Sequence, residues 1–112
     1  MKKSLIIFTF LLAFSYVDAQ ENKFATKRAS NAISHISSEM DLTEEQAQFI
    51  QETLYNKYAG NSLKIKGQGL SEGEKKDIYR AAAVATRKLL RDQFSKEEVL
   101  QIIKLERASF KK

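Results

Sequence analysis

Apolar residues recur along this chain at the spacing of amphipathic helices, and they do so in four stretches. The first stretch runs from Lys23 to Met40, where apolar side chains fall on one stripe at about 100° per residue. Lysine and serine side chains lie on the opposite face, which is typical of a helix with one buried and one solvated side. The apolar stripe consists of Ala25, Ala29, Ala32, Ile33, Ile36 and Met40.

The second stretch begins at Thr43 and carries its own apolar stripe. Gly60 and Asn61 follow, and residues of these types commonly end a helix. We therefore expect the helix to end at Gly60, with a flexible connection over residues 60–70. The predicted buried residues of this helix are Ala47, Ile50, Leu54 and Tyr58.

Two further stretches follow the glycine-containing region, one starting at Ser71 and one at Ser95. Neither Gly nor Pro marks a break near Phe94, so the pattern leaves open whether residues 71–110 form one bent helix or two. Leu100 and Leu105 fall outside the apolar stripe of the last stretch. The predicted buried residues are Ile78, Ala82, Ala85 and Leu89 in the third stretch, and Val99, Ile102, Ile103 and Phe110 in the fourth.

Three of these helices begin with the same arrangement of capping residues. A hydroxyl side chain accepts a hydrogen bond from a backbone N–H in the first turn, and a Gln or Glu side chain from that turn reaches back to the cap. An apolar residue precedes each cap, and an isoleucine follows at the same later position. The pairs are Thr43 with Gln46, Ser71 with Glu74, and Ser95 with Glu98.

The pattern predicts an all-α fold, with three to four amphipathic helices in a thin hairpin-like or cradle-like bundle and residues 20–112 as a single domain. The chain has 112 residues, no Cys and no Pro. Disulfides therefore cannot support its core, and a domain of this size buries only about two-thirds of its unfolded surface. We expect a homodimer, whose interface would cover Phe49, Leu100 and Leu105.

Residues 1–19 have the pattern of a signal peptide. Two lysines precede an apolar run from Leu5 to Phe14, and small residues then offer a cleavage site between Ala19 and Gln20. The apolar run is shorter than the roughly 20 residues that a membrane-spanning helix needs. We expect export across the inner membrane to the periplasm, with cleavage before Gln20.

Candidate catalytic and metal-binding residues are few. The chain has no Cys and a single His, and no serine lies in a nucleophile motif, so an enzyme is not expected. His35 is the one candidate metal ligand, with Glu39 one turn later and Met40 nearby, whereas first-row metals usually take three or four ligands. Residues 67–69 lack the rest of a phosphate-binding loop. We expect neither a metal nor another cofactor.

The formal net charge of +5 raises the question of nucleic-acid binding. Export, a surface of mixed charge and the lack of a recognition motif argue against it. Arg80, Arg87 and Arg91 lie within an arc of about 40° on one face of the third stretch, opposite its apolar stripe. A surface for acidic polypeptides is a better use of these arginines, although a plain solvated face has the same pattern.

The sequence Leu42-Thr43-Glu44-Glu45-Gln46 carries a Leu-Thr-x-x-Gln motif and resembles the Spy/CpxP family of small periplasmic proteins. Members carry the motif twice and form all-helical, cradle-shaped antiparallel dimers. The second copy here is degraded, since Phe94-Ser95-Lys96-Glu97-Glu98 has Glu98 where the family has Gln, and Leu70-Ser71-Glu72-Gly73-Glu74 is about as similar. The motif residues cap and anchor helix starts, so we expect them to determine the fold and not to contact a client. They are Leu42, Thr43 and Gln46 in the first copy and Phe94, Ser95 and Glu98 in the second.

The resemblance implies an ATP-independent chaperone that binds unfolded or partly folded polypeptides in the periplasm. One alternative is a regulator that binds a single partner, such as the sensor domain of an envelope-stress kinase. Another is a periplasmic metal sensor that uses His35. The candidate client-binding residues combine positive charge with one apolar side chain, and they are Lys27, Arg28, Arg80, Val84, Arg87 and Arg91.

Overall fold

The computed structural model describes residues 22–111, which fold into four α-helices. These are α2 (Lys23–Glu39), α3 (Glu44–Ile65), α4 (Glu72–Leu90) and α5 (Lys96–Ser109). No strand occurs in residues 22–111, and the predicted all-α fold is confirmed. The predicted signal peptide, residues 1–19, lies outside the described residues. Among the four helices, none is both long enough and apolar enough to cross a membrane.

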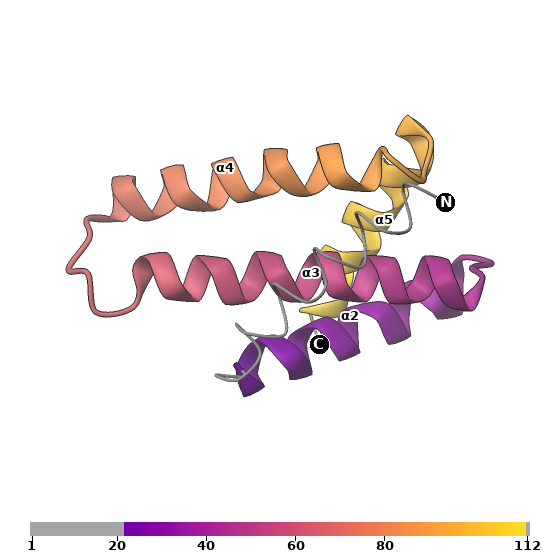
Figure 1. Cartoon of the computed structure of the whole chain (residues 1–112), viewed down its shortest axis with the longest axis horizontal. Helices are drawn as coiled ribbons and strands as arrows, with labels where there is room; N and C mark the ends of the chain where they lie inside the picture. Colours follow the sequence, from indigo (N-terminus) through magenta and orange to yellow (C-terminus); the bar gives the residue numbers. More distant parts are fainter. Residues whose placement is uncertain (1–21, 112) are drawn as a thin grey trace, which may run out of the picture.

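The helix α3 is the centre of the arrangement. It packs against α2 on one side and against α4 on the other, and α5 packs on α2. Figure 1 shows α2, α3 and α4 running back and forth in succession, with α5 running obliquely from the end of α4 past α3 towards α2. Because α4 follows α3 through a short connection and packs against it, the two form a helical hairpin.

The core is thin and combines small residues of α2 with branched residues of the other helices. The predicted stripe of α2 is confirmed, since its alanines and Ile36 are buried, while Ile33 and Met40 are half-buried against the same core. Small side chains on one helix leave room for larger ones from its neighbours, which keeps the packing dense. The other large members of the core are Ile50, Leu54, Tyr58, Leu90, Phe94, Val99, Ile102 and Ile103.

All three predicted capping boxes are formed. At the start of α3, the Gln46 N–H donates to Thr43 Oγ1 and the Thr43 N–H donates to Gln46 Oε1, both at 3.0 Å. Ser71 and Ser95 make the same pair of bonds at the starts of α4 and α5. A fourth cap, which was not predicted, begins α2, where Asn22 Oδ1 accepts a hydrogen bond from the Ala25 N–H at 3.0 Å.

Removal of the Thr43 cap is expected to lower the free energy of unfolding by about 1 kcal/mol. The change Thr43→Ala leaves the Gln46 N–H without its side-chain acceptor at the start of α3. Urea denaturation of this variant should be compared with that of Ser34→Ala, which alters an exposed serine of α2. Equal stability of the two variants would show that the box contributes nothing measurable.

The prediction that α3 ends at Gly60 is wrong, because the helix continues to Ile65. Ala59 and Asn61 on either side of Gly60 are buried, and this packing offsets the cost of roughly 1 kcal/mol that a glycine brings to a helix interior. The residue that ends α3 is Gly67, whose φ of 72° is accessible to glycine at little cost. The connection to α4 is therefore confined to residues 66–71.

The buried face of α4 also differs from the predicted one. Ile78 and Ala82 are half-buried as expected, but Ala85 and Leu89 are exposed, and the buried residues are Thr86 and Leu90. The helix ends at Leu90, and a turn carries the buried Phe94, whose ring centroid lies 6.4 Å from that of Phe49. The turn resolves the alternative that the sequence left open, because α4 and α5 are two separate helices.

On α5, the predicted burial of Val99, Ile102 and Ile103 is confirmed. Phe110 is 38% exposed, contrary to the prediction, and its place in the stripe is taken by the carboxylate-bearing Glu106, which is 2% exposed. Of the three residues expected at a dimer interface, Phe49 and Leu105 are partly buried against the core of the single chain. Only Leu100 is left exposed.

Candidate functional site

The candidate functional site is a partly open pocket of about 500 Å³ to which all four helices contribute. Its cationic side chains are Arg28 from α2 and Lys57 and Lys66, which lie in α3 and directly after it. Aromatic rings from α2, α3 and α4 and from the residue directly after α5 form much of the remaining wall. These are Phe24, Tyr58, Tyr79 and Phe110.

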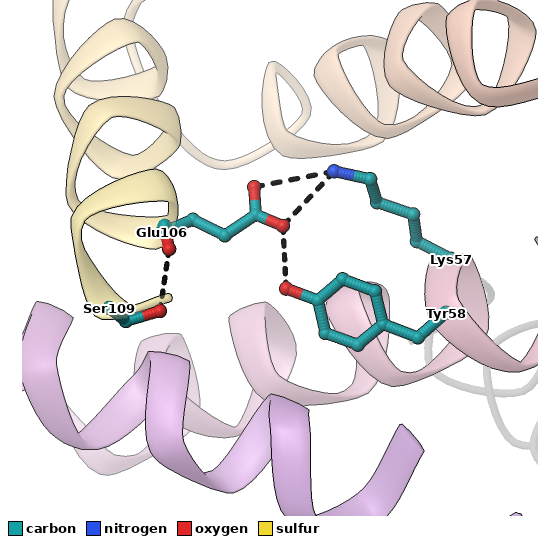
Figure 2. A network of polar contacts seen from close by, with 4 residues as sticks. All are labelled: Lys57, Tyr58, Glu106 and Ser109. Carbon is teal, nitrogen blue, oxygen red and sulfur yellow. Dashed lines mark hydrogen bonds and ion pairs between the residues drawn. The ribbon is translucent and has the colours of Figure 1, made fainter. Parts of the chain in front are cut away.

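A buried polar network at one side of the pocket joins α3 to α5 (Figure 2). Glu106 Oε2 lies 3.0 Å from Lys57 Nζ, and the other carboxylate oxygen lies 3.4 Å from the same nitrogen. The Tyr58 hydroxyl donates to Oε2 at 2.5 Å. Removing a carboxylate from water is costly unless it is paired and hydrogen-bonded, and these two partners meet that condition.

Burial raises the pKa of the Tyr58 phenol far above its ordinary value. The hydrogen bond that the phenol donates to Glu106 and the negative charge of that carboxylate raise the pKa further, whereas the positive charge of Arg28 lowers it. The phenol therefore stays protonated through the physiological range and acts as a hydrogen-bond donor within the core.

Alkaline pH is expected to weaken the fold partly through Tyr58. In the unfolded chain the phenol loses its proton near pH 10, whereas in the folded protein it keeps the proton to higher pH. The contribution is complete below about pH 10 and is lost above it, by about 1.4 kcal/mol per pH unit. Urea denaturation across this range should show a shallower fall for Tyr58→Phe than for the wild type. Parallel curves would contradict the assignment.

The Arg28 side chain lines the pocket and is surrounded by three aromatic rings. Its guanidinium carbon is 3.8 Å from the ring centroid of Phe110, 5.3 Å from that of Tyr58 and 5.6 Å from that of Phe24. These distances are those of cation–π interactions. The buried Nε atom of Arg28 has no hydrogen-bond partner, and the ion pairs found among residues 22–111 do not include this arginine.

The six residues predicted to bind clients lie in three places. Arg80, Val84, Arg87 and Arg91 are exposed along α4, where the helical period brings them onto a common outer face. Lys27 is exposed on α2, on the other side of α3 from α4 (Figure 1). Arg28 is half-buried in the pocket.

The residues of the two motif copies either pack against the core or cap the starts of helices. Leu42 is partly buried against the core, and Phe94 is buried beneath the turn between α4 and α5. The hydroxyl and carboxyl or amide groups of the two motif copies form the capping boxes of α3 and α5. These contacts leave Thr43, Gln46, Ser95 and Glu98 with the role of holding helix starts.

His35 is half-buried on α2, and its backbone carbonyl accepts a hydrogen bond from the Ser38 hydroxyl at 2.6 Å. Within residues 22–111, no group of three or more His, Asp or Glu side chains is placed to hold a metal ion. Within the described part of the chain, His35 is therefore not part of a set of side chains that could hold a metal ion.

The residues that give this pocket its character are not predicted from the sequence. The apolar pattern places Tyr58 on a buried stripe, but the prediction does not include its partner Glu106 or the neighbouring Lys57. A signal for Glu106 existed, because it lies at helical spacing from Ile102 and Ile103 and so places a carboxylate on an apolar face. No comparable local signal brings Phe24 next to Arg28 and Phe110.

Comparison with known proteins found no relative of this chain. No family model matches the chain, and no curated protein or solved structure shows significant similarity to it. The fold and site define a small all-α protein with a cationic, aromatic-lined pocket.

Proposed function

We propose that the protein is an ATP-independent, chaperone-like protein that binds unfolded or partly folded polypeptides, and that α4 provides the capturing surface. The observation that carries this proposal is the unusual exposure of α4. Of its nineteen residues only Thr86 and Leu90 are buried. Such a helix contributes little to the core and presents most of its length to the surroundings.

The exposed side chains of α4 combine the two properties that transient binding of clients requires. Val84 is 47% exposed, lies on the same face of α4 as the arginines and offers modest apolar contact. Positive charge beside it attracts acidic segments over a long range and speeds their capture. That charge comes from Arg80, Arg87 and Arg91, which are exposed and form no ion pair within residues 22–111.

The proposed place of action is the periplasm, on the strength of the signal-peptide pattern in residues 1–19. Nucleotide is unavailable as an energy source there, so binding and release must follow from affinity alone. Weak apolar contacts and screened charges suit that requirement, because neither holds a client irreversibly.

The test is light scattering of two unrelated aggregating proteins, with and without the mature protein and without nucleotide. We expect suppression of aggregation for both clients at near-stoichiometric ratios. Suppression should weaken at high salt, because exposed charges are screened over about 10 Å at 0.1 M ionic strength. If neither client is protected, the chaperone proposal is wrong, and a regulator of one defined partner becomes the better explanation.

A matched pair of variants tests the role of α4. Changing Arg80, Arg87 and Arg91 together to glutamine should remove most of the suppression. The control changes Lys96, Lys104 and Arg107 to glutamine, which removes the same charge from exposed positions of α5. Equal loss in the two triple variants, or suppression that is insensitive to salt, would rule out capture by the α4 arginines.

A further inference from the structure

The side chains that line the pocket carry more positive than negative charge. Glu106 is already matched by Lys57 and by the Tyr58 hydroxyl. Arg28 and Lys66 have no carboxylate partner in the described part of the chain, so the pocket holds three cations against one carboxylate. The positive excess favours an anionic occupant.

Arg28 has hydrogen-bonding capacity that the protein does not use. A guanidinium carries five N–H donors in a rigid fork that matches a carboxylate. The three aromatic rings around Arg28 fix its position, but ring faces are poor substitutes for hydrogen-bond acceptors, and its buried Nε atom is unpartnered. Because the Arg28 guanidinium forms no hydrogen bond within residues 22–111, an anion in the pocket would offer its accessible N–H groups the acceptors that the described chain does not supply.

The rest of the pocket suits the apolar body of a small molecule. Phe24, Ile65, Tyr79 and Phe110 line it, and the first of these is 64% exposed despite its size. The volume of about 500 Å³ falls within the roughly 300–1,000 Å³ of typical small-ligand pockets. A ligand that covered these side chains would gain the free energy of removing apolar surface from water.

We propose that this pocket binds a fatty acid, a carboxylate on an alkyl chain. The carboxylate lies against the Arg28 fork and the alkyl chain covers the aromatic wall. The site is independent of the proposed capture of polypeptides by the outer face of α4.

The probe is dodecanoate, titrated into the mature protein by calorimetry below its critical micelle concentration. We expect saturable binding of one molecule per chain and a rise in melting temperature with dodecanoate concentration. Dodecanol and acetate are the ligand controls, and each should bind more weakly. Equal binding of dodecanol would show that the carboxylate is not recognised, and equal binding of acetate would show that the alkyl chain is not recognised. Either result would overturn the proposal.

Two variants locate the site. Arg28→Gln should weaken dodecanoate binding by about tenfold or more, because a charged hydrogen-bond partner is lost. Ala83→Phe fills the pocket while retaining Arg28, so it should abolish binding even if Arg28→Gln proves unstable. Arg107→Gln, an exposed change on α5, should bind as the wild type does.

Full affinity in Ala83→Phe would place the ligand elsewhere and refute the proposal. So would binding of an acidic apolar peptide, but not of dodecanoate, at a site blocked by Ala83→Phe. The triple arginine variant of α4 should retain dodecanoate binding, because its changes lie outside the pocket. Loss of chaperone activity and loss of fatty-acid binding can thus be told apart.

Discussion

Replacing Glu106 with alanine is expected to lower the free energy of unfolding by about 3 kcal/mol or more. Glu106 is 2% exposed, and its carboxylate is the acceptor for both Lys57 and Tyr58. Without it, the Lys57 ammonium, whose side chain is only 18% exposed, and the phenol of Tyr58 lose their acceptor. A buried charge without a counter-charge costs more than the ion pair contributed, and the void left by the side chain adds to the loss.

Thermal and urea denaturation measure this effect. For a domain of this size, about 3 kcal/mol corresponds to a fall in melting temperature of roughly 12 °C or more. The control is Glu98→Ala, which removes an exposed carboxylate from the same helix and costs only part of a capping box. Comparable losses for the two variants would mean that the buried network does not stabilise the fold.

A triple variant separates the cost of an unpaired charge from the value of the network itself. Glu106→Leu with Lys57→Met and Tyr58→Phe replaces all three polar partners by apolar groups of similar volume. Such replacements are often neutral or stabilising, because no ion remains to be desolvated. We expect the triple variant to recover most of the stability that Glu106→Ala loses.

Local signals accounted for the capped helix starts and for most of the buried faces of α2, α3 and α5. Thr43, Ser71 and Ser95 begin helices because a hydroxyl and an acidic or amide side chain satisfy backbone donors close by in sequence, so neighbouring residues determine the outcome. The stripe of α2 was equally clear, since apolar and polar residues separate cleanly around that helix.

The sequence pattern gave wrong predictions where tertiary contacts decide which of two possible helix ends or helix faces occurs. Gly60 and Gly67 can both end α3, and burial of Ala59 and Asn61 selects the later one. In α4, residues 81–83 and 85 are all alanine, so the apolar surface is too broad to fix which side faces α3. The packed helix turns Thr86 and Leu90 inward and leaves Ala85 and Leu89 outside.

The pocket was beyond prediction from sequence for a related reason. Arg28 and Phe110 lie at opposite ends of the described chain, and their approach to 3.8 Å depends on α5 crossing back to α2. The sequence identified Arg28 as a cation available for binding, but it could not show that aromatic rings surround it. A site assembled from all four helices has no signature in the spacing of any one of them.

Two adjacent leucines of α4 test the orientation of that helix directly. Leu90 is completely buried whereas Leu89 is 48% exposed. Leu90→Ala should lower the free energy of unfolding by about 3 kcal/mol, through lost apolar burial and a cavity beside α3. Leu89→Ala should cost about 0.5 kcal/mol or less, as exposed substitutions usually do.

The pair is well matched, because both changes replace leucine by alanine in the last turn of the same helix. Differences in helix propensity and in the unfolded chain therefore cancel between the variants. Urea denaturation gives both values under one set of conditions. A larger loss for Leu89→Ala would mean that α4 packs with the face predicted from its apolar pattern. That rotation would carry Tyr79 and Ala83 away from the pocket and turn the arginines of α4 to a different side.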